Sequence, residues 1–261
     1  MFLKWAGGKR RLLQHILPLI PKNVRVYYEP FMGGGAVLFA MTEKNPKFIV
    51  ANDSNEELIL CYETVRDKLP EVLECLAEMK NKDSEDFYYE VRGWDRNDFE
   101  GKTKPERAAR FIYLNKTGYN GLWRVNQAGF NNVPFGHREF RYDENLVREA
   151  AQKLSHVLLK TGDFAVAVDS AGKNDFAYFD PPYMETFTGY TKNGFGEEEQ
   201  KRLRDVCVGL MSKGTKILVS NKDLPAIRDI WNGFKIEKID VFHALGCKDR
   251  KNVGEVLIKN F

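Results

Sequence analysis

Residues 24–35 read Val-Arg-Val-Tyr-Tyr-Glu-Pro-Phe-Met-Gly-Gly-Gly, and this segment is the strongest indication of the fold class. Val24–Tyr28 has the β-branched and aromatic composition of a short strand. Three glycines follow it, and residues 36–41 are then predicted to be helical. A glycine-rich turn between a first strand and a helix lets a ligand approach the backbone N–H groups at the helix start. We therefore expect a ligand-binding strand–turn–helix unit here.

The alternation of strand and helix continues along the chain. Helices are predicted at 56–79 and 197–211, and strands at 48–51, 157–160, 176–179 and 216–219. Two more strands, at 235–242 and 253–258, could form a hairpin. This order predicts an α/β fold with a mostly parallel, doubly wound sheet whose antiparallel tail makes one edge mixed.

Length and composition limit the class of protein. A chain of 261 residues fits either one large domain or one domain with a sizeable insertion, at roughly 150 residues per domain. No run approaches the ~18 apolar residues of a membrane span, and the N-terminus has no signal-peptide pattern. The 4 cysteines and 4 histidines lack metal-ligand spacing. We therefore expect no bound metal, no disulfide framework and a cytoplasmic protein.

The middle of the chain, from about residue 80 to 142, loses the strand–helix alternation and differs in charge. The whole chain carries a net charge of +3, but residues 104–142 hold seven basic and two acidic residues, a local charge of +5. Basic residues neutralise phosphates, aromatic rings stack on bases, and Arg and Asn can read base edges. The same segment is rich in aromatic residues and contains five asparagines, Asn115, Asn120, Asn126, Asn131 and Asn132. We interpret it as a nucleic-acid-binding insertion, in which Phe111, Tyr113 and Leu114 form the buried face of a helix that begins near Pro105.

The sharpest chemical signal is Asp180-Pro181-Pro182-Tyr183, which follows the predicted strand 176–179. Open α/β sheets bind ligands at the carboxyl ends of their strands. The prolines remove two N–H donors and leave carbonyl acceptors, Asp180 adds a carboxylate, and Tyr183 adds a flat ring. This combination suits a planar amine. The simpler alternative is a proline-rich turn at the end of a strand.

Two more motifs bear on the ligand. Asp53 lies 18 residues past Gly35, at the end of the second predicted strand, where a carboxylate can bind ribose hydroxyls. The glycines lack the GxGxxG spacing of a dinucleotide site, and a tight turn with a solvated aspartate is the alternative. Gly7-Gly8-Lys9 is like the end of a phosphate loop, but Arg10 replaces the Ser/Thr, which disfavours NTP hydrolysis. Taken alone, Lys4, Lys9, Arg10 and Arg11 are explained by a solvated basic face.

Five motifs together resemble the Dam family of DNA adenine-N6 methyltransferases (D12 class, alpha group). They are KWAGGK at 4–9, EPFMGGG at 29–35, NKTGYNGLWR at 115–124, NVPFG at 132–136 and DPPY at 180–183. They occur in the family's order and cover essentially the whole chain. The resemblance implies a Rossmann-like, S-adenosylmethionine-dependent methyltransferase sheet with an antiparallel edge hairpin, formed by residues 1–60 and 150–261. It also implies a mostly helical DNA target-recognition domain inserted at 61–149.

The resemblance carries over to individual residues. The catalytic loop would be Asp180, Pro181, Pro182 and Tyr183. S-adenosylmethionine would be bound by Trp5, Lys9, Phe31, Gly33, Gly35, Asp53, Asp163, Phe164 and Asp180. DNA would be bound by Lys4, Lys116, Tyr119, Asn120, Leu122, Arg124, Pro134 and Arg138. The implied reaction is methylation of adenine N6 in double-stranded DNA, within GATC and after base flipping, in the prokaryotic nucleoid or a phage-infected cell.

Within the recognition residues, the resemblance assigns different tasks. Tyr119 would wedge into the duplex while Asn120 helps to hold the gap, and Arg124 would contact a guanine. Leu122 and Pro134 would make apolar base contacts, and Lys4 would reach an outer base pair. The pair His137-Arg138 departs from the basic-then-aromatic pair of some relatives, which bears on discrimination at that outer pair.

Three other classes of protein share part of this pattern. An RNA N6-adenine methyltransferase would share the donor and the DPPY motif, although the recognition insertion favours DNA. A non-enzymatic DNA-binding module would have little use for DPPY together with Asp53 and Lys9. A nucleotide-dependent dehydrogenase fits the α/β pattern but not the three glycines, DPPY or the basic insertion. No obligatory protein partner and no membrane association are indicated.

Overall fold

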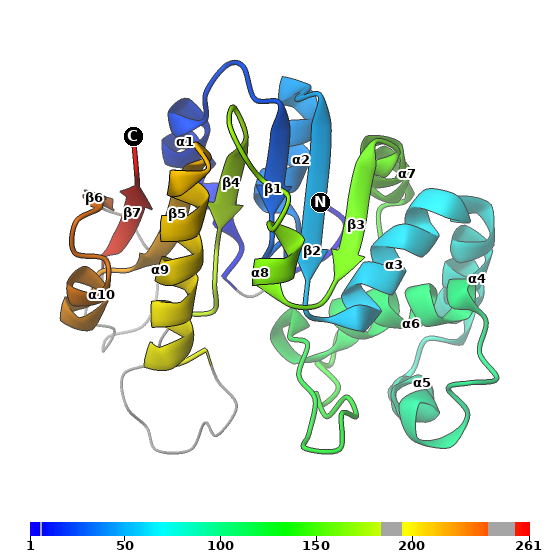
Figure 1. Ribbon diagram of the computed structural model, residues 1–261. Helices are drawn as coiled ribbons and strands as arrows, with labels where there is room; N and C mark the ends of the chain where they lie inside the picture. The colour runs from blue at the N-terminus through cyan, green and yellow to red at the C-terminus, as the bar shows by residue number, and fades with distance from the viewer. Residues whose placement is uncertain (6, 184–194, 240–253) are drawn as a thin grey trace. The chain divides into compact units, whose positions relative to one another are not determined.

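The computed structural model describes residues 1–5, 7–183, 195–239 and 254–261 (Figure 1). The chain divides into two compact units. The first unit contains residues 1–9, 33–43 and 55–161, and the second contains residues 10–32, 44–54 and 162–261. The assignment of 1–60 and 150–261 to methyl transfer and of 61–149 to DNA recognition concerns function, and it stays a prediction.

Six of the seven described strands lie in the second unit, in the order β2-β1-β4-β5-β7-β6. Strands β2, β1, β4 and β5 are parallel, whereas β7 is antiparallel to both β5 and β6. The predicted Rossmann-like α/β sheet with an antiparallel edge hairpin is confirmed, although residues 240–242 and 253 of the predicted hairpin lie outside the described residues. The strands are β1 (Val26–Glu29), β2 (Phe48–Asp53), β4 (Phe176–Phe179), β5 (Lys216–Lys222), β6 (Lys235–Ile239) and β7 (Glu255–Lys259).

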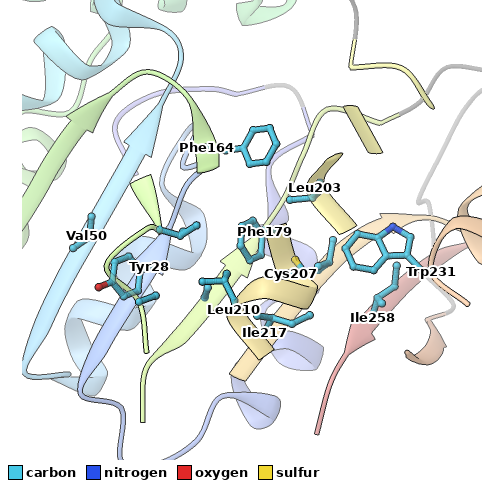
Figure 2. Close-up of a cluster of buried hydrophobic side chains, with 14 of the residues drawn as sticks. Tyr28, Val50, Phe164, Phe179, Leu203, Cys207, Leu210, Ile217, Trp231 and Ile258 are labelled. Carbon is cyan, nitrogen blue, oxygen red and sulfur yellow. The ribbon is translucent and has the colours of Figure 1, made fainter. Parts of the chain in front are cut away.

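The core of the second unit lies between this sheet and its helices. Strands β1 and β4 are buried along their whole length, as expected for parallel strands that are covered on both faces. Helix α9 (Glu197–Ser212) turns Leu203, Cys207 and Leu210 toward β5 because residues spaced by four and three share one helix face (Figure 2). The shorter helical segments of the unit are η1 (Lys9–Leu12), α1 (Leu13–Ile16), η2 (Leu17–Leu19), α8 (Phe164–Ala167) and α10 (Pro225–Ile230).

Helix α6 (Lys104–Thr117) is the central element of the first unit. It contacts α3, α4 and α5, and Phe111, Tyr113 and Leu114 are buried as predicted. A capping box starts the helix, since Thr103 and Glu106 bond each other's backbone N–H groups. The other elements of this unit are α2 (Ala36–Lys44), α3 (Glu56–Asp67), α4 (Leu69–Lys82), α5 (Glu85–Asn97), η3 (Tyr119–Gly121), α7 (Glu144–Leu154) and β3 (Val157–Thr161).

The prediction of one long helix at 56–79 is wrong. The segment forms two helices, α3 and α4, which meet at Lys68, where the backbone has φ −138° and ψ 44°. Pro70 lies in the first turn of α4. A proline lacks the N–H that would continue the preceding helix, and its ring clashes with the carbonyl four residues earlier. Pro70 was therefore a sequence signal for this break.

Within the described residues, no helix is both long enough and apolar enough to cross a membrane. Three cysteines in this part of the chain, Cys61, Cys75 and Cys207, are free thiols. No group of His, Cys, Asp or Glu among the same residues could hold a metal ion.

One face of α5 holds the segment 131–134 through the backbone of that segment. Tyr88 donates hydrogen bonds to the Val133 and Pro134 carbonyls (2.9 and 3.3 Å), and Arg92 donates to the Val133 carbonyl (2.9 Å). Asp95 accepts from the Asn131 N–H (2.7 Å) and pairs with the buried Arg110 (2.8 Å). Residues 88, 92 and 95 share a helix face, so one side of α5 fixes the shape of this irregular segment.

The phenol of Tyr88 makes this contact sensitive to alkaline pH. Burial raises the pKa of Tyr88 from 10.0 to about 12. Between pH 10 and 12, the folded state therefore keeps a phenol proton that the unfolded state loses. The corresponding contribution to the free energy of unfolding is fully present below pH 10 and is lost as pH rises toward 12. We expect Tyr88→Phe to remove this part of the alkaline fall in the free energy of unfolding, and to cost about 0.5–1.5 kcal/mol at neutral pH through the lost hydrogen bond.

The measurement is urea unfolding at pH values from neutral to 12. Tyr89→Phe, which changes the exposed neighbouring tyrosine, is the control and should keep the wild-type pH dependence. Identical alkaline curves for Tyr88→Phe and the wild type would contradict this role of Tyr88.

Candidate functional site

The second unit gathers the predicted catalytic and donor-binding carboxylates at one edge of its sheet. Strands β1, β2 and β4 run parallel, so their carboxyl ends lie at the same edge. Asp53 ends β2 and Asp180 follows β4. Between β1 and β4 the chain connections change direction along the sheet, and such switch points are where open α/β sheets bind ligands.

Asn52 is a buried residue that organises the loops at this edge. Its side-chain amide donates to the carbonyls of Pro30 and Gly162, each at 3.0 Å. Its own carbonyl accepts from the N–H of Met32 (2.9 Å). Asn52 thereby fixes the loops that carry Phe31 and Asp163. In the sequence, Asn52 only follows the predicted strand 48–51, and nothing near it indicates this role.

An aromatic surface and a charged residue lie on these loops. The rings of Phe31 and Phe164 stack with centroids 5.2 Å apart, and Phe195 packs edge-on against Phe31 at 5.5 Å. Asp163 caps α8 by accepting from the Ala165 N–H (3.0 Å), and it pairs with Arg202 at 2.6 Å. The hydrogen bond from Arg202 lowers the pKa of Asp163, so this carboxylate stays ionised at neutral pH.

The segment Asp180–Tyr183 is held at both ends by side chains of neighbouring strands. Ser220 of β5 donates to Asp180 Oδ1 at 2.9 Å. The Tyr183 hydroxyl donates to Glu255 Oε2 of β7 at 2.9 Å, and Lys222 Nζ lies 5.6 Å from the Tyr183 ring centroid. Burial raises the pKa of Tyr183, which keeps its phenol protonated as the hydrogen bond requires.

A second carboxyl group, Glu29, lies buried at the end of β1. It is 2% exposed and accepts a hydrogen bond from Tyr27 at 2.6 Å. Burial raises the pKa of Glu29, and the charge of Asp180 raises it further, against the opposing effect of the Tyr27 bond. This favours the neutral form of Glu29 beside the Asp180 carboxylate.

In the first unit, the N-terminal segment packs on the glycine turn. Gly33 and Gly35 have positive φ values of 47° and 70°. A Cβ atom on Gly33 would come within 2.6 Å of Trp5 Nε1, so the Trp5 ring requires a glycine there. Lys9 is 5% exposed, and its ammonium group donates to the Gly7 carbonyl at 2.8 Å.

The buried amide of Asn115 joins two predicted DNA-binding segments of the same unit. Its Oδ1 accepts from the Lys4 N–H (2.8 Å), and its Nδ2 donates to the Lys4 carbonyl (2.7 Å) and the Gly121 carbonyl (3.1 Å). The turn 119–121 is thus fixed from below, with Tyr119 54% exposed and Asn120 in the left-handed region at φ 55°. Tyr119 is therefore a large aromatic side chain held out toward solvent.

The guanidinium of Arg124 is oriented by one asparagine. Arg124 Nε donates to Asn132 Oδ1 at 2.6 Å, and Nη2 donates to the Asn132 carbonyl at 3.3 Å. Arg124 is exposed, and so are Pro134 and Arg138, whereas Leu122 is half-buried. Burial lowers the pKa of Lys116, and the nearby charge of Lys4 lowers it further. Phe111 stacks on Trp5 (6.2 Å) and on Trp123 (4.0 Å) beneath this surface.

The expectation that all five asparagines present amides to bases is corrected by the structure. Asn115 and Asn131 are buried. The Asn126 oxygen accepts from the N–H groups of Ala128 and Phe130 (both 3.0 Å), and the Asn131 oxygen accepts from the Val133 N–H (3.1 Å). Asparagine in irregular segments readily bonds nearby backbone, and this local chemistry outweighs base reading at these positions.

Comparison with known proteins identifies the family. The model of the D12 class N6 adenine-specific DNA methyltransferases matches residues 5–245. The Type II methyltransferase M1.LlaDCHI of Lactococcus lactis subsp. cremoris is 37% identical and aligns with 100% of this chain and 95% of its own length. The Type II methyltransferase M.MjaIII of Methanocaldococcus jannaschii is 36% identical, with coverage of 100% and 98%. The DNA adenine methylase of Haemophilus influenzae is 34% identical, with coverage of 97% and 90%. The chain therefore belongs to the D12 class of N6 adenine-specific DNA methyltransferases.

Proposed function

We propose that this adenine-specific DNA methyltransferase modifies N6 of adenine within GATC in double-stranded DNA, after flipping the target base out of the duplex. The enzyme class follows from the family, and the methyl donor is S-adenosylmethionine. The observation that carries the proposal is the segment Asp180–Tyr183. It combines a carboxylate fixed by Ser220 with a ring fixed by Glu255, at the ligand-binding edge of the sheet.

The chemistry of the two residue sets fits this donor. In the second unit, the stacked Phe31 and Phe164 offer an aromatic surface for a purine, and Asp53 offers a carboxylate for the ribose hydroxyls. Asp163 would accept a hydrogen bond from the donor's adenine amino group on the side of its carboxylate that Arg202 does not occupy. In the first unit, Trp5, Lys9, Gly33 and Gly35 would bind the methionine part, with backbone N–H groups and an ammonium for its carboxylate. When bound, the donor supplies an electrophilic methyl group on its sulfonium.

The catalytic loop would act on the amino group of the target adenine. The Asp180 carboxylate and the Pro181 carbonyl would accept its two N–H groups, which draws the nitrogen lone pair out of conjugation with the ring. Pro182 keeps the loop rigid, because its φ is fixed, and Tyr183 would stack on the base. Positioning and charge stabilisation then account for the catalysis, and no covalent enzyme intermediate is required.

Access to N6 requires the base to leave the stack, since the target nitrogen is unreachable inside a duplex. Tyr119 is exposed at the tip of a fixed turn, which suits a side chain that wedges between bases. Asn120 would help to hold the vacated space. Residues 61–149 would thus carry recognition, while 1–60 and 150–261 carry donor binding and catalysis.

Sequence recognition would rest on a few side chains of the first unit. The bonds to Asn132 hold Arg124 by Nε and by one hydrogen of Nη2. A guanidinium held this way still has the donors of its Nη1/Nη2 edge, which match guanine O6 and N7. Leu122 and Pro134 would contact thymine methyl groups, and Lys4 would reach the outer base pair. Lys116 and Arg138 would bind phosphates.

The direct test is to incubate the enzyme with labelled donor and unmethylated plasmid, and then to map N6-methyladenine by sequencing. We expect methylation at the adenine of GATC. Methylation at adenines of another sequence would reject the GATC assignment, and faster methylation of RNA than of duplex DNA would reject the DNA substrate. Methylation that is equally fast on single strands would contradict the role of the duplex.

Asp180→Ala is expected to abolish methyl transfer and to leave DNA binding within a few-fold of the wild type. Loss of one fixed acceptor at the reacting group should lower the rate by about 10²–10³-fold or more. Single-turnover methyl transfer and duplex binding are the two measurements. Asp205→Ala, at an exposed position on α9, is the control that should behave as the wild type. A fully active Asp180→Ala enzyme would rule out this mechanism.

Arg124→Ala is expected to relax specificity at one base pair. The loss of a guanine contact should cost about 1–3 kcal/mol in discrimination at that position only. The measurement is kcat/KM for a set of duplexes in which each base pair of the site is replaced in turn, with Arg148→Ala on α7 as the control. Equal losses on all duplexes would instead make Arg124 a phosphate contact.

A further inference from the structure

A chain of three polar side chains links the core of the second unit to the catalytic carboxylate. Ser220 Oγ lies 2.9 Å from Asp180 Oδ1, and the Tyr178 hydroxyl lies 3.0 Å from Ser220 Oγ. Tyr178 is 1% exposed and Ser220 is fully buried, while Asp180 is half-buried. Tyr178 lies in β4, Asp180 directly follows β4 and Ser220 lies in β5, and the two strands pair in parallel with Phe179 opposite Val219.

The protons of this chain can be placed from the chemistry of its members. An ionised carboxylate only accepts hydrogen bonds, so the single proton of the Ser220 hydroxyl points to Asp180. The Ser220 oxygen then accepts from the Tyr178 hydroxyl. The result is a directed chain that runs from Tyr178 through Ser220 to Asp180, and each donor in it has one acceptor.

We propose that Ser220, oriented by Tyr178, is a positioning residue for methyl transfer that fixes the rotation of the Asp180 carboxylate. This inference rests on the proposed role of Asp180. A hydrogen bond to Oδ1 removes the freedom of the carboxylate to turn about its Cβ–Cγ bond. The bond from Ser220 therefore ties the direction in which the carboxylate meets the amino group to β5, a buried strand. A catalytic acceptor needs this precision, because small misplacements are costly in rate.

The same unit contains a matched pair of residues outside this chain. The hydroxyls of Tyr28 and Ser170 lie 3.2 Å apart, and Tyr28 is buried on the neighbouring strand β1. Tyr28 pairs with Ala177 in the β1–β4 register, so its side chain lies on the opposite face of the sheet from Tyr178, and Ser170 follows α8. A comparison of the two pairs separates the role in catalysis from the general cost of removing a tyrosine–serine contact.

The experiment measures single-turnover methyl transfer at saturating donor and duplex, together with the Kd of each. We expect Ser220→Ala to lower the rate by about 10- to 100-fold, the effect of losing a hydrogen bond to a charged group, with both Kd values within twofold of the wild type. Ser220→Thr restores the hydroxyl and should recover most of the rate. Ser170→Ala should match the wild type in all three measurements.

Because Ser220 is fully buried, Tyr178→Phe serves as a second variant that leaves the serine in place. It should slow the reaction by about 2- to 10-fold, since only the neutral hydrogen bond behind Ser220 is lost, whereas Tyr28→Phe should not. A wild-type rate for Ser220→Ala or for Tyr178→Phe would overturn the proposal. So would a Ser220→Ala enzyme whose whole defect lies in the Kd of donor or DNA.

Asp180→Ala in the same assay separates the two levels of inference. An inactive Asp180→Ala enzyme beside a fully active Ser220→Ala enzyme would remove the role of Ser220 and leave the proposed function intact. An active Asp180→Ala enzyme would remove both.

Discussion

The parallel pairing of β1 with β4 is the constraint on which the edge that carries the proposed catalytic loop depends. Tyr27 and Tyr28 face Phe176 and Ala177 in register, so both strands end at the same edge, and the chain must leave the sheet there twice. One exit carries Phe31 and the other carries Asp180. Since the strands are buried on both faces, their carboxyl groups lie where the strands end. Glu29 and Asp180 occupy those ends, and each has a hydroxyl donor, Tyr27 or Ser220.

The first unit meets a different requirement, which is to hold irregular backbone in one shape. Segments without helix or strand still need partners for their N–H and C=O groups. Asn115 supplies three such bonds from inside the unit, and α5 supplies others from one face. The loops that carry Tyr119 and Pro134 are therefore held through their backbone carbonyls by side chains of α6 and α5. Because the buried side chains hold the backbone, the side chains of Tyr119 and Arg124 can remain exposed.

The sequence predicted regular elements well and buried polar partners poorly. A continuous apolar run such as 176–179 predicts a strand from its own residues, because a strand buried on both faces is apolar along its whole length. Pro70 indicated a break between two helices, but the helical spacing of apolar residues over 56–79 led to the prediction of one helix. Ser220 and Asn52 could not be assigned from sequence, since their partners lie 40 and 110 residues away in the chain. The expectation that Asn115 and Asn131 present their amides to bases was wrong for a related reason. In sequence, an asparagine that binds backbone cannot be distinguished from one that binds a base.

The position of β7 between β5 and β6 has a consequence for the proposed catalytic loop. β6 precedes β7 in the chain, yet its described ladder is with β7 alone, so β6 is attached to the sheet only through β7. Glu255 at the start of β7 bonds Tyr183, across 72 residues of sequence. A chain in which β7 is detached from β5 would therefore keep the bond from Ser220 to Asp180 but lose the bond that fixes the Tyr183 ring.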